Sequence, residues 1–318
     1  MDGMPTVKHP DSKRTFHEAV GWKAEDFFTD PQVVELCRAI EANDLERMKQ
    51  LLDGGVDVNA IGTGGMTPLL WSFFDNNVER FELLLDHGAD PSVKITTNLG
   101  VSQAFAVGDS AATLAAHSYY SSLYDAVVGH VKDFNITGAY GQPFLHIIIR
   151  APISQEEKRR RILLAIEHGA DIQQKDSLGT LATTAVGNGQ QWELVLWLLD
   201  QGVDSSYCRP LDHYCLVHHV LSHEDRLTPG REQAYVNLLE RLRQEGHDLD
   251  TIRKQRETFV GLMTNREKDL YIKSRIAEQV RSGLRPDPEL GEEASEAWYA
   301  ERRRQRMVGQ SDDSAPIE

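Results

Sequence analysis

One short phrase recurs along the 318-residue chain and limits what the chain can fold into. In each copy apolar residues are followed by a polar pair and then by Gly-X-Asp or a degenerate version of it. The six aspartates of these copies lie 33, 43, 38, 33 and 44 residues apart, at Asp57, Asp90, Asp133, Asp171, Asp204 and Asp248. A period in this range indicates stacked structural repeats, with insertions in the longer copies. The fold is therefore expected to be an array in which each unit buries its apolar side against its neighbours.

Apolar residues around these phrases are spaced as on short amphipathic helices. The first copy carries two such sets, Val33, Val34, Cys37 and Ile40, then Leu45, Met48, Leu51 and Leu52. Each helix has about three turns, too few for stability in isolation. Asn43-Asp44 separates the first pair, so each repeat is predicted to be helix–turn–helix. A glycine follows each well-formed second helix, where a left-handed cap is favoured, at Gly55, Gly88, Gly169, Gly202 and Gly246.

Three stretches carry a family resemblance. The second copy contains Gly65-Met66-Thr67-Pro68-Leu69-Leu70, the fourth Gly141-Gln142-Pro143-Phe144-Leu145-His146, and the fifth Asp176-Ser177-Leu178-Gly179. From Asp30 to Asp250 the sequence resembles the ankyrin repeat family, with a poor match in the third copy. The resemblance implies an all-α repeat solenoid with short hairpin fingers, and it makes His146 a buried hydrogen-bonding residue. Additional helices are expected beyond the repeats, at the C-terminus.

Four segments are predicted. Residues 1–29 form an N-terminal arm or cap, residues 30–250 about six degenerate repeats, residues 251–308 a C-terminal helical extension and residues 309–318 a disordered tail. The first segment is rich in apolar residues, at Phe16, Val20, Trp22, Phe27 and Phe28. They are expected to cover the terminal repeat, with a binding arm as the alternative. Insertions at 94–107, 151–155 and 222–231 are either contact loops or tolerated surface loops.

Charge and cysteine content narrow the class of protein. The net charge of −15, from 49 acidic and 34 basic residues, argues against nucleic acid or an anionic membrane as partner. It favours a basic partner or solubility alone. Three cysteines make no disulfide scaffold and suit a reducing compartment. No stretch is apolar over the length of a membrane helix. The expected location is cytoplasmic, or periplasmic if a leader peptide has been removed.

The motifs that suggest chemistry are incomplete. Zinc prefers thiolate and imidazole ligands, and the sixth repeat is rich in both, with Cys208, His213, Cys215, His218, His219 and His223. Their spacing matches no closed zinc site, so a structural role is favoured. The run from Gly62 to Gly65 lacks the Lys-Ser/Thr of a phosphate loop, and the chain has no G-x-S-x-G motif. No cofactor, no metal and no enzymatic activity are therefore predicted.

The resemblance implies binding of another protein through a concave face made of finger tips and first helices. The predicted partner-binding residues are Met66, Phe74, Asp75, Tyr119 (with its neighbour Tyr120), Tyr140, Gln142, Arg150, Leu178, Thr180 and Asn188. For Phe74 and the tyrosine pair, core packing is the competing interpretation. The leading hypothesis is a protein-binding scaffold that neutralises a toxin or effector, as bacterial immunity proteins do. The alternatives are a host-directed effector or general scaffold, and a metal-binding or enzymatic protein using the sixth repeat.

Overall fold

The computed structural model describes residues 15–74, 77–100, 105–176, 179–208 and 214–254. The chain divides after residue 247 into two units, and of the second unit only residues 248–254 are described. Most of the predicted C-terminal extension, all of the predicted tail and the first fourteen residues of the predicted arm lie outside the described residues. The fold below is that of the first unit.

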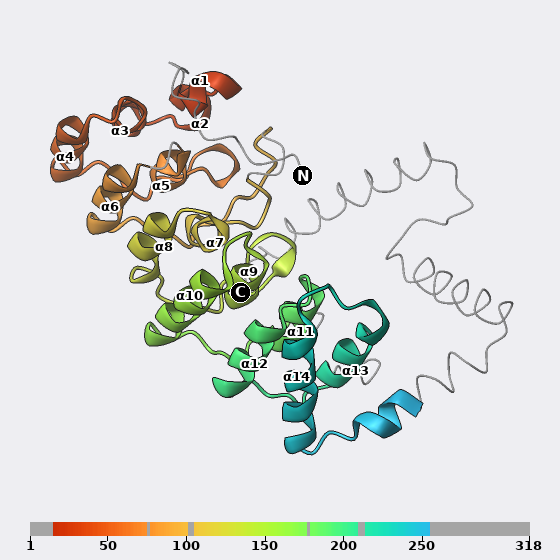
Figure 1. Cartoon of the computed structure of the whole chain (residues 1–318). Helices are drawn as coiled ribbons and strands as arrows, with labels where there is room; N and C mark the ends of the chain where they lie inside the picture. The colour runs from red at the N-terminus through yellow and green to blue at the C-terminus, as the bar shows by residue number, and fades with distance from the viewer. Residues whose placement is uncertain (1–14, 75–76, 101–104, 177–178, 209–213, 255–318) are drawn as a thin grey trace, which may run out of the picture. The chain divides into compact units, whose positions relative to one another are not determined.

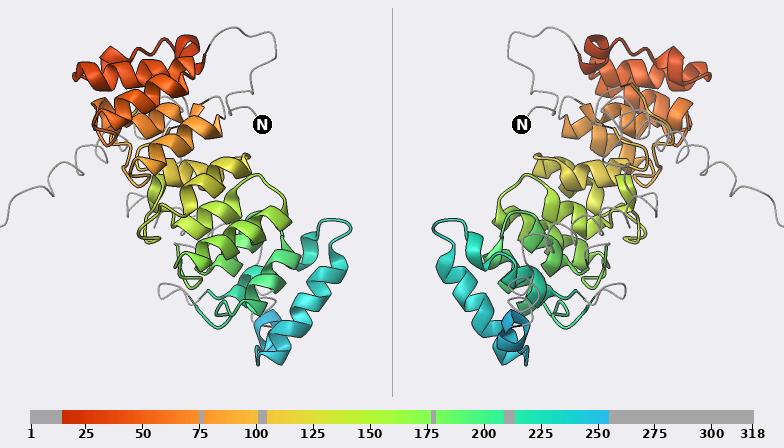
Figure 2. Two further views of the ribbon diagram at one scale, coloured as in Figure 1. Left: turned by 90° about the vertical axis from the view of Figure 1, so that its left-hand side faces the viewer. Right: turned by 90° about the vertical axis from the view of Figure 1, so that its right-hand side faces the viewer.

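Six helix pairs follow one another in the described part of this unit. They are α3 (Pro31–Ala42) with α4 (Leu45–Asp53), α5 (Pro68–Ser72) with α6 (Val78–Asp86), α7 (Ala111–His117) with α8 (Ser121–Val128), α9 (Phe144–Arg150) with α10 (Gln155–Glu167), α11 (Leu181–Gly187) with α12 (Trp192–Asp200), and α13 (Leu216–Leu221) with α14 (Glu232–Gln244). We call the first helix of each pair inner and the second outer. Figure 1 shows the outer helices α4 to α12 stacked in one layer and the inner helices α3 to α11 in another. The views of Figure 2 show the same order of stacking from two further sides.

Short connections complete the architecture. In the described part of the chain, 3₁₀ turns lie between helices at η1 (Thr63–Gly65), η3 (Ala139–Gly141) and η4 (Glu224–Arg226). The described residues form no β-strand, only three isolated antiparallel bridges, Thr137 with Pro143, Asp176 with Gly179 and Cys208 with Cys215. Each bridge closes a hairpin finger that leads from one repeat into the next inner helix. Among the described helices, none is both long and apolar enough to cross a membrane.

The helix ends confirm the sequence prediction. Asp30 caps α3 by accepting from Gln32 N, and Thr67 caps α5 by accepting from Leu70 N, with Pro68 in the first turn. The five predicted cap glycines all have φ between 85° and 101°, in the left-handed region that a side chain would strain. The turns after α4, α6, α10, α12 and α14 can therefore reverse sharply because glycine stands there, whereas Gly129 at the end of α8 has an ordinary negative φ.

The recurring aspartates form the turn that follows this glycine. Oδ1 of Asp57, Asp90 and Asp171 accepts a hydrogen bond from the backbone N–H two residues later, at 3.0, 2.8 and 2.8 Å. Asp133 and Asp204 make the same contact. Carboxylates that bond their own backbone in this way stabilise turns. These aspartates therefore recur because the turn recurs. No binding partner is needed to explain the negative charge at these positions.

Amide side chains link neighbouring turns at two junctions. Asn59 Nδ2 donates to Gly88 O at 2.9 Å, while Asn59 Oδ1 accepts from Asp90 N at 2.7 Å. Gln173 makes the same pair of contacts between the fourth and fifth repeats, donating to Gly202 O at 2.7 Å and accepting from Asp204 N at 3.2 Å. We call these two side chains with their contacts the amide clips. Each clip satisfies a donor and an acceptor of the next repeat with one side chain.

Two buried arginines hold the ends of inner helices. Arg80, on α6, donates to Ile40 O at 2.9 Å and Ser72 O at 3.2 Å, and also to the carbonyl of Phe74. Arg161, on α10, is 0% exposed and donates from Nη1 to Ser118 O at 2.8 Å and to the carbonyls of Ala115 and Ala116. The last carbonyls of a helix have no partner within the helix, and the cation also favours the negative end of its dipole. We call Arg80 and Arg161 the arginine clamps.

Candidate protein-binding face

The N-terminal segment lies against the inner helix of the second repeat. It forms α1 (Phe16–Val20) and α2 (Ala24–Phe27). The His17 ring is fully buried, stacks on Trp71 at 4.2 Å between centroids, and its Nε2 lies 3.1 Å from Trp71 O. The Phe16 ring stacks on Phe74, with centroids 3.5 Å apart. The predicted cap therefore contacts α5 and Phe74, which follows it.

A second aromatic group joins this contact from the insertion before the third repeat. The Phe105 ring also stacks on Phe74, with centroids 4.6 Å apart, and it meets Trp22 edge-on. Trp22 in turn stacks on Trp71 at 5.9 Å. We call Phe16, His17, Trp22 and Phe105 the aromatic cover. It fills the inner face of the second repeat with the chain's own side chains.

The cover corrects part of the predicted binding surface. Phe74 is 5% exposed, so its side chain is core, which is the competing interpretation given above. Met66 is 0% exposed and Thr180, the N-cap residue of α11, is 1% exposed. These three side chains cannot form a contact surface in this structure. Asp75 and Leu178 lie outside the described residues.

Tyr140 is the most exposed large apolar side chain of the described residues, at 85%. It lies at the turn of the fourth finger, where Gly138 N donates to Gln142 O at 2.9 Å. Its φ of 60° and ψ of 21° place it in the left-handed region, which costs an L residue with a side chain about 1–2 kcal/mol. Strain of this kind is retained at sites of function more often than elsewhere. The finger thus holds an aromatic ring in water at a conformational cost.

Arg150, at the end of α9, is held in place by a network of buried side chains. Its Nη2 lies 2.5 Å from Asp176 Oδ2, whose side chain is only 7% exposed. Asp176 also lies 3.3 Å from His146 Nδ1. The His146 side chain is 0% exposed, with Nδ1 2.9 Å from Thr184 Oγ1 and Nε2 3.0 Å from Gln174 O. His146 is therefore the buried hydrogen-bonding residue that the resemblance implied.

The other predicted residues remain at the surface. Asn188 is exposed and donates from Nδ2 to Ile149 O at 2.8 Å, which brings it beside Arg150. Gln142 is half-buried in the finger of Tyr140. Tyr119 is 59% exposed in the turn after α7, whose Ser118 carbonyl is bound by Arg161. We call Tyr119, Tyr140, Gln142, Arg150 and Asn188 the open face.

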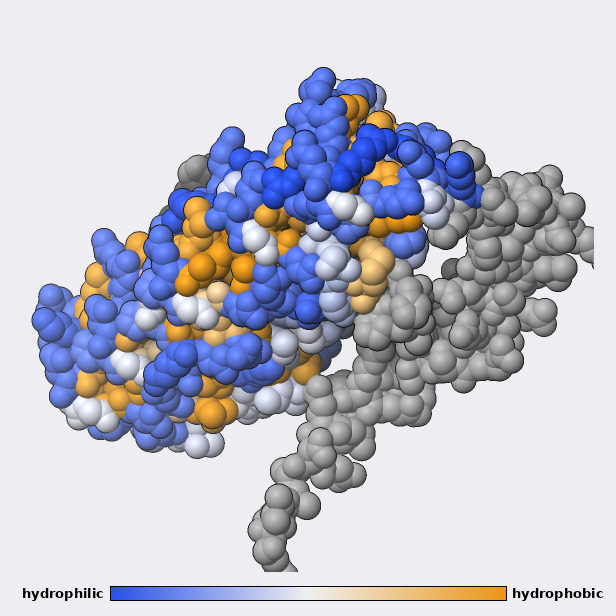
Figure 3. Space-filling view, turned by 90° about the horizontal axis from the view of Figure 1, so that it is seen from below, coloured by the Kyte–Doolittle hydropathy of each residue, from blue (hydrophilic) through white to orange (hydrophobic). Residues whose placement is uncertain are grey.

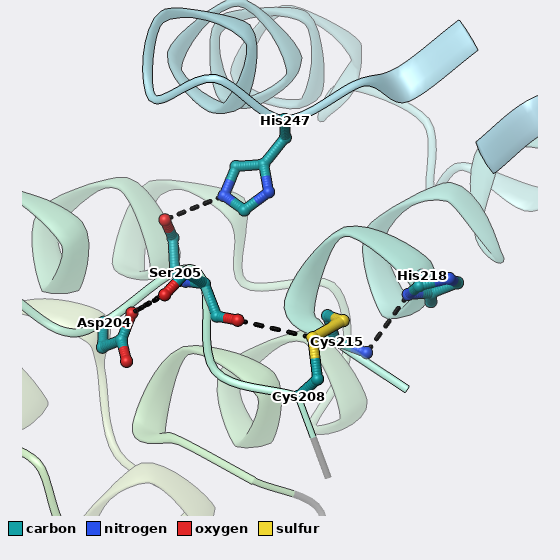
Figure 4. Close-up of a disulfide and its surroundings, with 7 residues drawn as sticks. Asp204, Ser205, Cys208, Cys215, His218 and His247 are labelled. Atoms are coloured by element: carbon teal, nitrogen blue, oxygen red, sulfur yellow. Dashed lines mark hydrogen bonds between the residues drawn. A yellow bond between two sulfur atoms is a disulfide. The ribbon is translucent and has the colours of Figure 1, made fainter. Parts of the chain in front are cut away.

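The sixth finger carries a disulfide that the sequence did not predict. Cys208 and Cys215 are joined, with Cα atoms 4.1 Å apart, across the third isolated bridge (Figure 4). Pairing removes both thiolates from any zinc site, and the described residues contain no group of metal ligands. Cys37 remains a free, buried thiol.

The histidines of this repeat have structural surroundings. His218 Nδ1 accepts from Cys215 N at 3.1 Å at the start of α13, and His247 Nε2 lies 2.9 Å from Ser205 Oγ. Figure 4 shows the two contacts on either side of the disulfide. His213 lies outside the described residues. Figure 3, which views the molecule from below, shows a mainly hydrophilic surface with small separate hydrophobic patches.

Comparison with known proteins supports the resemblance. The sequence model of the ankyrin repeat family matches residues 64–96. The chain is 43% identical over 54 residues to the potassium channel AKT1 of Oryza sativa, a match that covers 17% of this chain and 6% of the channel. The curated relatives are thus matched over a small part of their length, and the likeness is to a repeat segment.

Two crystal structures share the fold. The ankyrin repeat protein EF0377 superposes with a TM-score of 0.51 and 22% identity, covering 65% of this chain and 97% of that one. The ankyrin repeat domain of Bcl-3 gives a TM-score of 0.50 and 20% identity, over 67% of this chain and 86% of that one. The all-α solenoid fold predicted from the repeats is confirmed.

Proposed function

We propose that this ankyrin-repeat array is a non-catalytic scaffold that holds a partner protein on its open face. The observation that supports the proposal most directly is Tyr140, an 85% exposed ring kept in a left-handed conformation. Tyrosine and arginine are the side chains that most often dominate protein interfaces. Arg150 supplies the second anchor, held in place by Asp176 before any partner arrives. A pre-positioned anchor loses less conformational entropy on binding.

The aromatic cover sets one limit of the proposed surface. Phe74 follows the inner helix α5, in the same way that Arg150 ends α9 and Asn188 follows α11. The rings of Phe16 and Phe105, however, already stack on Phe74. A partner can reach that position only by displacing buried rings. The proposed contact surface therefore starts at the third repeat and continues through the fifth.

Neutralisation of a toxin or effector is the finer form of this proposal, and a host-directed effector or a general scaffold is its alternative. All three use the same face, so the identity of the captured protein separates them. A partner encoded beside the gene supports neutralisation, whereas a specific eukaryotic partner supports the effector role. The metal or enzyme hypothesis for the sixth repeat has lost its thiolate ligands to the disulfide.

The test is affinity capture from the native organism's lysate with the full chain, followed by identification of the captured protein. A Tyr140→Ser, Arg150→Gln, Asn188→Ala variant is compared with an outer-helix control, Lys49→Ser, Glu82→Gln, Glu193→Gln, whose residues are exposed. Circular dichroism confirms that both variants fold. We expect the open-face variant to lose the partner by about 100-fold or more in affinity and the control to keep it. Equal binding by both variants, or no specific partner at all, would refute the proposal.

A further inference from the structure

We infer that the open face binds an acidic segment of its partner, although the chain itself is strongly acidic. This inference rests on the proposed function and adds the chemical class of the ligand. It is carried by the distribution of charge between the two helix layers and by a row of side chains along the fingers. It also reverses the expectation of a basic partner that the net charge alone suggested.

The two helix layers carry different charges. Each outer helix from α4 to α12 contains at least one carboxylate, whereas among the inner helices only α3 contains any, and α5, α7, α9, α11 and α13 contain no aspartate or glutamate. The only permanently charged side chain on those five inner helices is that of Arg150. Six further carboxylates are those of the recurring turn aspartates. The net charge of −15 therefore does not describe the inner side of the array.

The fingers add basic and aromatic groups to this side. Lys175, directly before the fifth finger's bridge, places its Nζ 4.3 Å from the ring centroid of Tyr207, which precedes the sixth finger's bridge. Lys94 Nζ donates to Thr137 Oγ1 at 3.1 Å, and Thr137 begins the fourth finger's bridge. Both contacts thus link one finger to the next. The sequence pattern did not predict this row.

These cations are held in place and still face solvent. Lys94 and Lys175 are both exposed. A lysine over an aromatic ring keeps its hydrogen-bond donors while its chain is restrained. Carboxylates bind ammonium and guanidinium groups through charge-assisted hydrogen bonds, which are stronger than neutral ones. An acidic segment running along the array could contact Lys175, Arg150 and Tyr140 in turn.

Among the described residues, three carboxylates near this row are already bound within the protein. Asp176 is bound to Arg150 and to Gly179 N. Asp109 Oδ1 accepts from Ala139 N at 2.9 Å and so ties the fourth finger to the third. Asp204 interacts electrostatically with Lys175, and it accepts hydrogen bonds from both the N–H and the hydroxyl of Ser206. Each of these three carboxylates therefore already has a partner within the chain.

The experiment presents the full chain with a displayed library of random peptides. We expect the selected peptides to be enriched in aspartate and glutamate. One selected peptide is then synthesised, and its affinity is measured for the wild type, for Lys175→Glu and for the outer-helix control Lys49→Glu. Both lysines are exposed, so neither change should disturb folding.

The expected result is a loss of at least about tenfold in affinity for Lys175→Glu, little change for Lys49→Glu, and weaker binding as salt rises from about 50 to about 200 mM. Selection of peptides that lack acidic residues, but whose binding is lost in the Tyr140→Ser, Arg150→Gln, Asn188→Ala variant, would overturn this inference and leave the proposed function standing. Acidic peptides that bind both charge-reversed variants equally would place their site elsewhere and also overturn it. No enrichment of any peptide counts against the inference, and the lysate capture then decides the proposed function separately.

Discussion

The second and fourth repeats use the end of the inner helix in opposite ways. In the second, Phe74 is buried beneath Phe16 and Phe105. In the fourth, Arg150 meets solvent and rests on a buried carboxylate. The backbone at the two positions comes from the same helix–turn–helix unit, so the repeat alone does not decide whether its inner end is core or surface. Segments outside the repeats decide it, by covering one end of the array and leaving the next repeats open.

The largest effect should come from the covered end. Trp71 is 0% exposed, stacks on His17 and donates from Nε1 to Glu41 at 3.1 Å. Trp71→Ala should lower the free energy of unfolding by about 3–5 kcal/mol, measured by urea unfolding followed by circular dichroism. Trp197→Ala, at a half-buried ring, is the control and should cost much less. Similar small losses for both would show that the aromatic cover is loosely packed.

The next largest effect should come from the arginine clamps, Arg80 in the covered second repeat and Arg161 in the open fourth repeat. Arg80→Met and Arg161→Met should each cost about 2–4 kcal/mol, because several buried helix-end carbonyls lose their donor. The matched control is Arg160→Met, since Arg160 is an exposed neighbour paired with Asp125 and Glu157. It should cost less than about 1 kcal/mol. Equal losses of unfolding free energy at Arg80 and Arg161 would show that the aromatic cover does not change what a clamp contributes. A much larger loss at one of them would show that the two clamps are not equivalent.

The comparison can be tested directly at Phe74 and Tyr140. Phe74→Ala should lower the free energy of unfolding by about 3 kcal/mol, as for a buried ring. Tyr140→Gly should leave it unchanged or raise it by up to about 1 kcal/mol, because glycine relieves the left-handed strain and little buried area is lost. Urea unfolding measures both. A clear destabilisation by Tyr140→Gly would mean that the ring supports the fold, which would weaken its proposed role as an anchor.

The smallest effect concerns pH and Glu41, at the border of the cover. Burial raises the pKa of the Glu41 carboxyl above its usual value, and the nearby Glu25 and Glu18 carboxylates raise it further, against the opposing hydrogen bond from Trp71. A raised pKa in the folded state gives stability below the unfolded pKa and loses it as pH rises through the folded pKa. Glu41→Gln keeps an acceptor for Trp71 without the charge.

The Glu41→Gln variant should therefore gain in urea midpoint relative to wild type as pH rises from about 4 to about 7. The gain should be small because Glu41 is only half-buried and solvent screens its charge. Glu46→Gln, at an exposed position on α4, should show no such trend. A constant difference between wild type and Glu41→Gln over this range would contradict the assignment.

Short sequence patterns predicted those features of the fold that depend only on the local backbone. The turn aspartates, the cap glycines and Pro68 marked the repeat boundaries, since each reports the backbone around itself. Contacts between distant segments were not predictable in the same way. Phe16 and Phe105 lie far from Phe74 in the sequence, so no local pattern shows that their rings stack on it. The clearest unused signal was the aromatic run of Trp71, Phe73 and Phe74, which is too apolar for an uncovered inner helix.

The candidate site followed the same rule. Tyr140, Arg150 and Asn188 were predicted to share a face from their register in the repeat, and the structure leaves all three at least partly exposed. Lys175 and Tyr207 were missed because their meaning depends on a contact between two fingers. The disulfide was missed for a similar reason, since Cys208 and Cys215 pair only once the sixth finger closes as a hairpin.

The amide clips also bear on how the array responds to force. In a chain of repeats each unit contacts only its neighbours, so bending or twisting is shared among the junctions. The junctions spanned by Asn59 and Gln173 must break two hydrogen bonds to one side chain before they can open. They should act as the stiff links of the array. Elastic deformation would then concentrate at junctions spanned by neither an amide clip nor an arginine clamp, such as the one between the second and third repeats, where the curvature of the array could adjust to the shape of a bound partner.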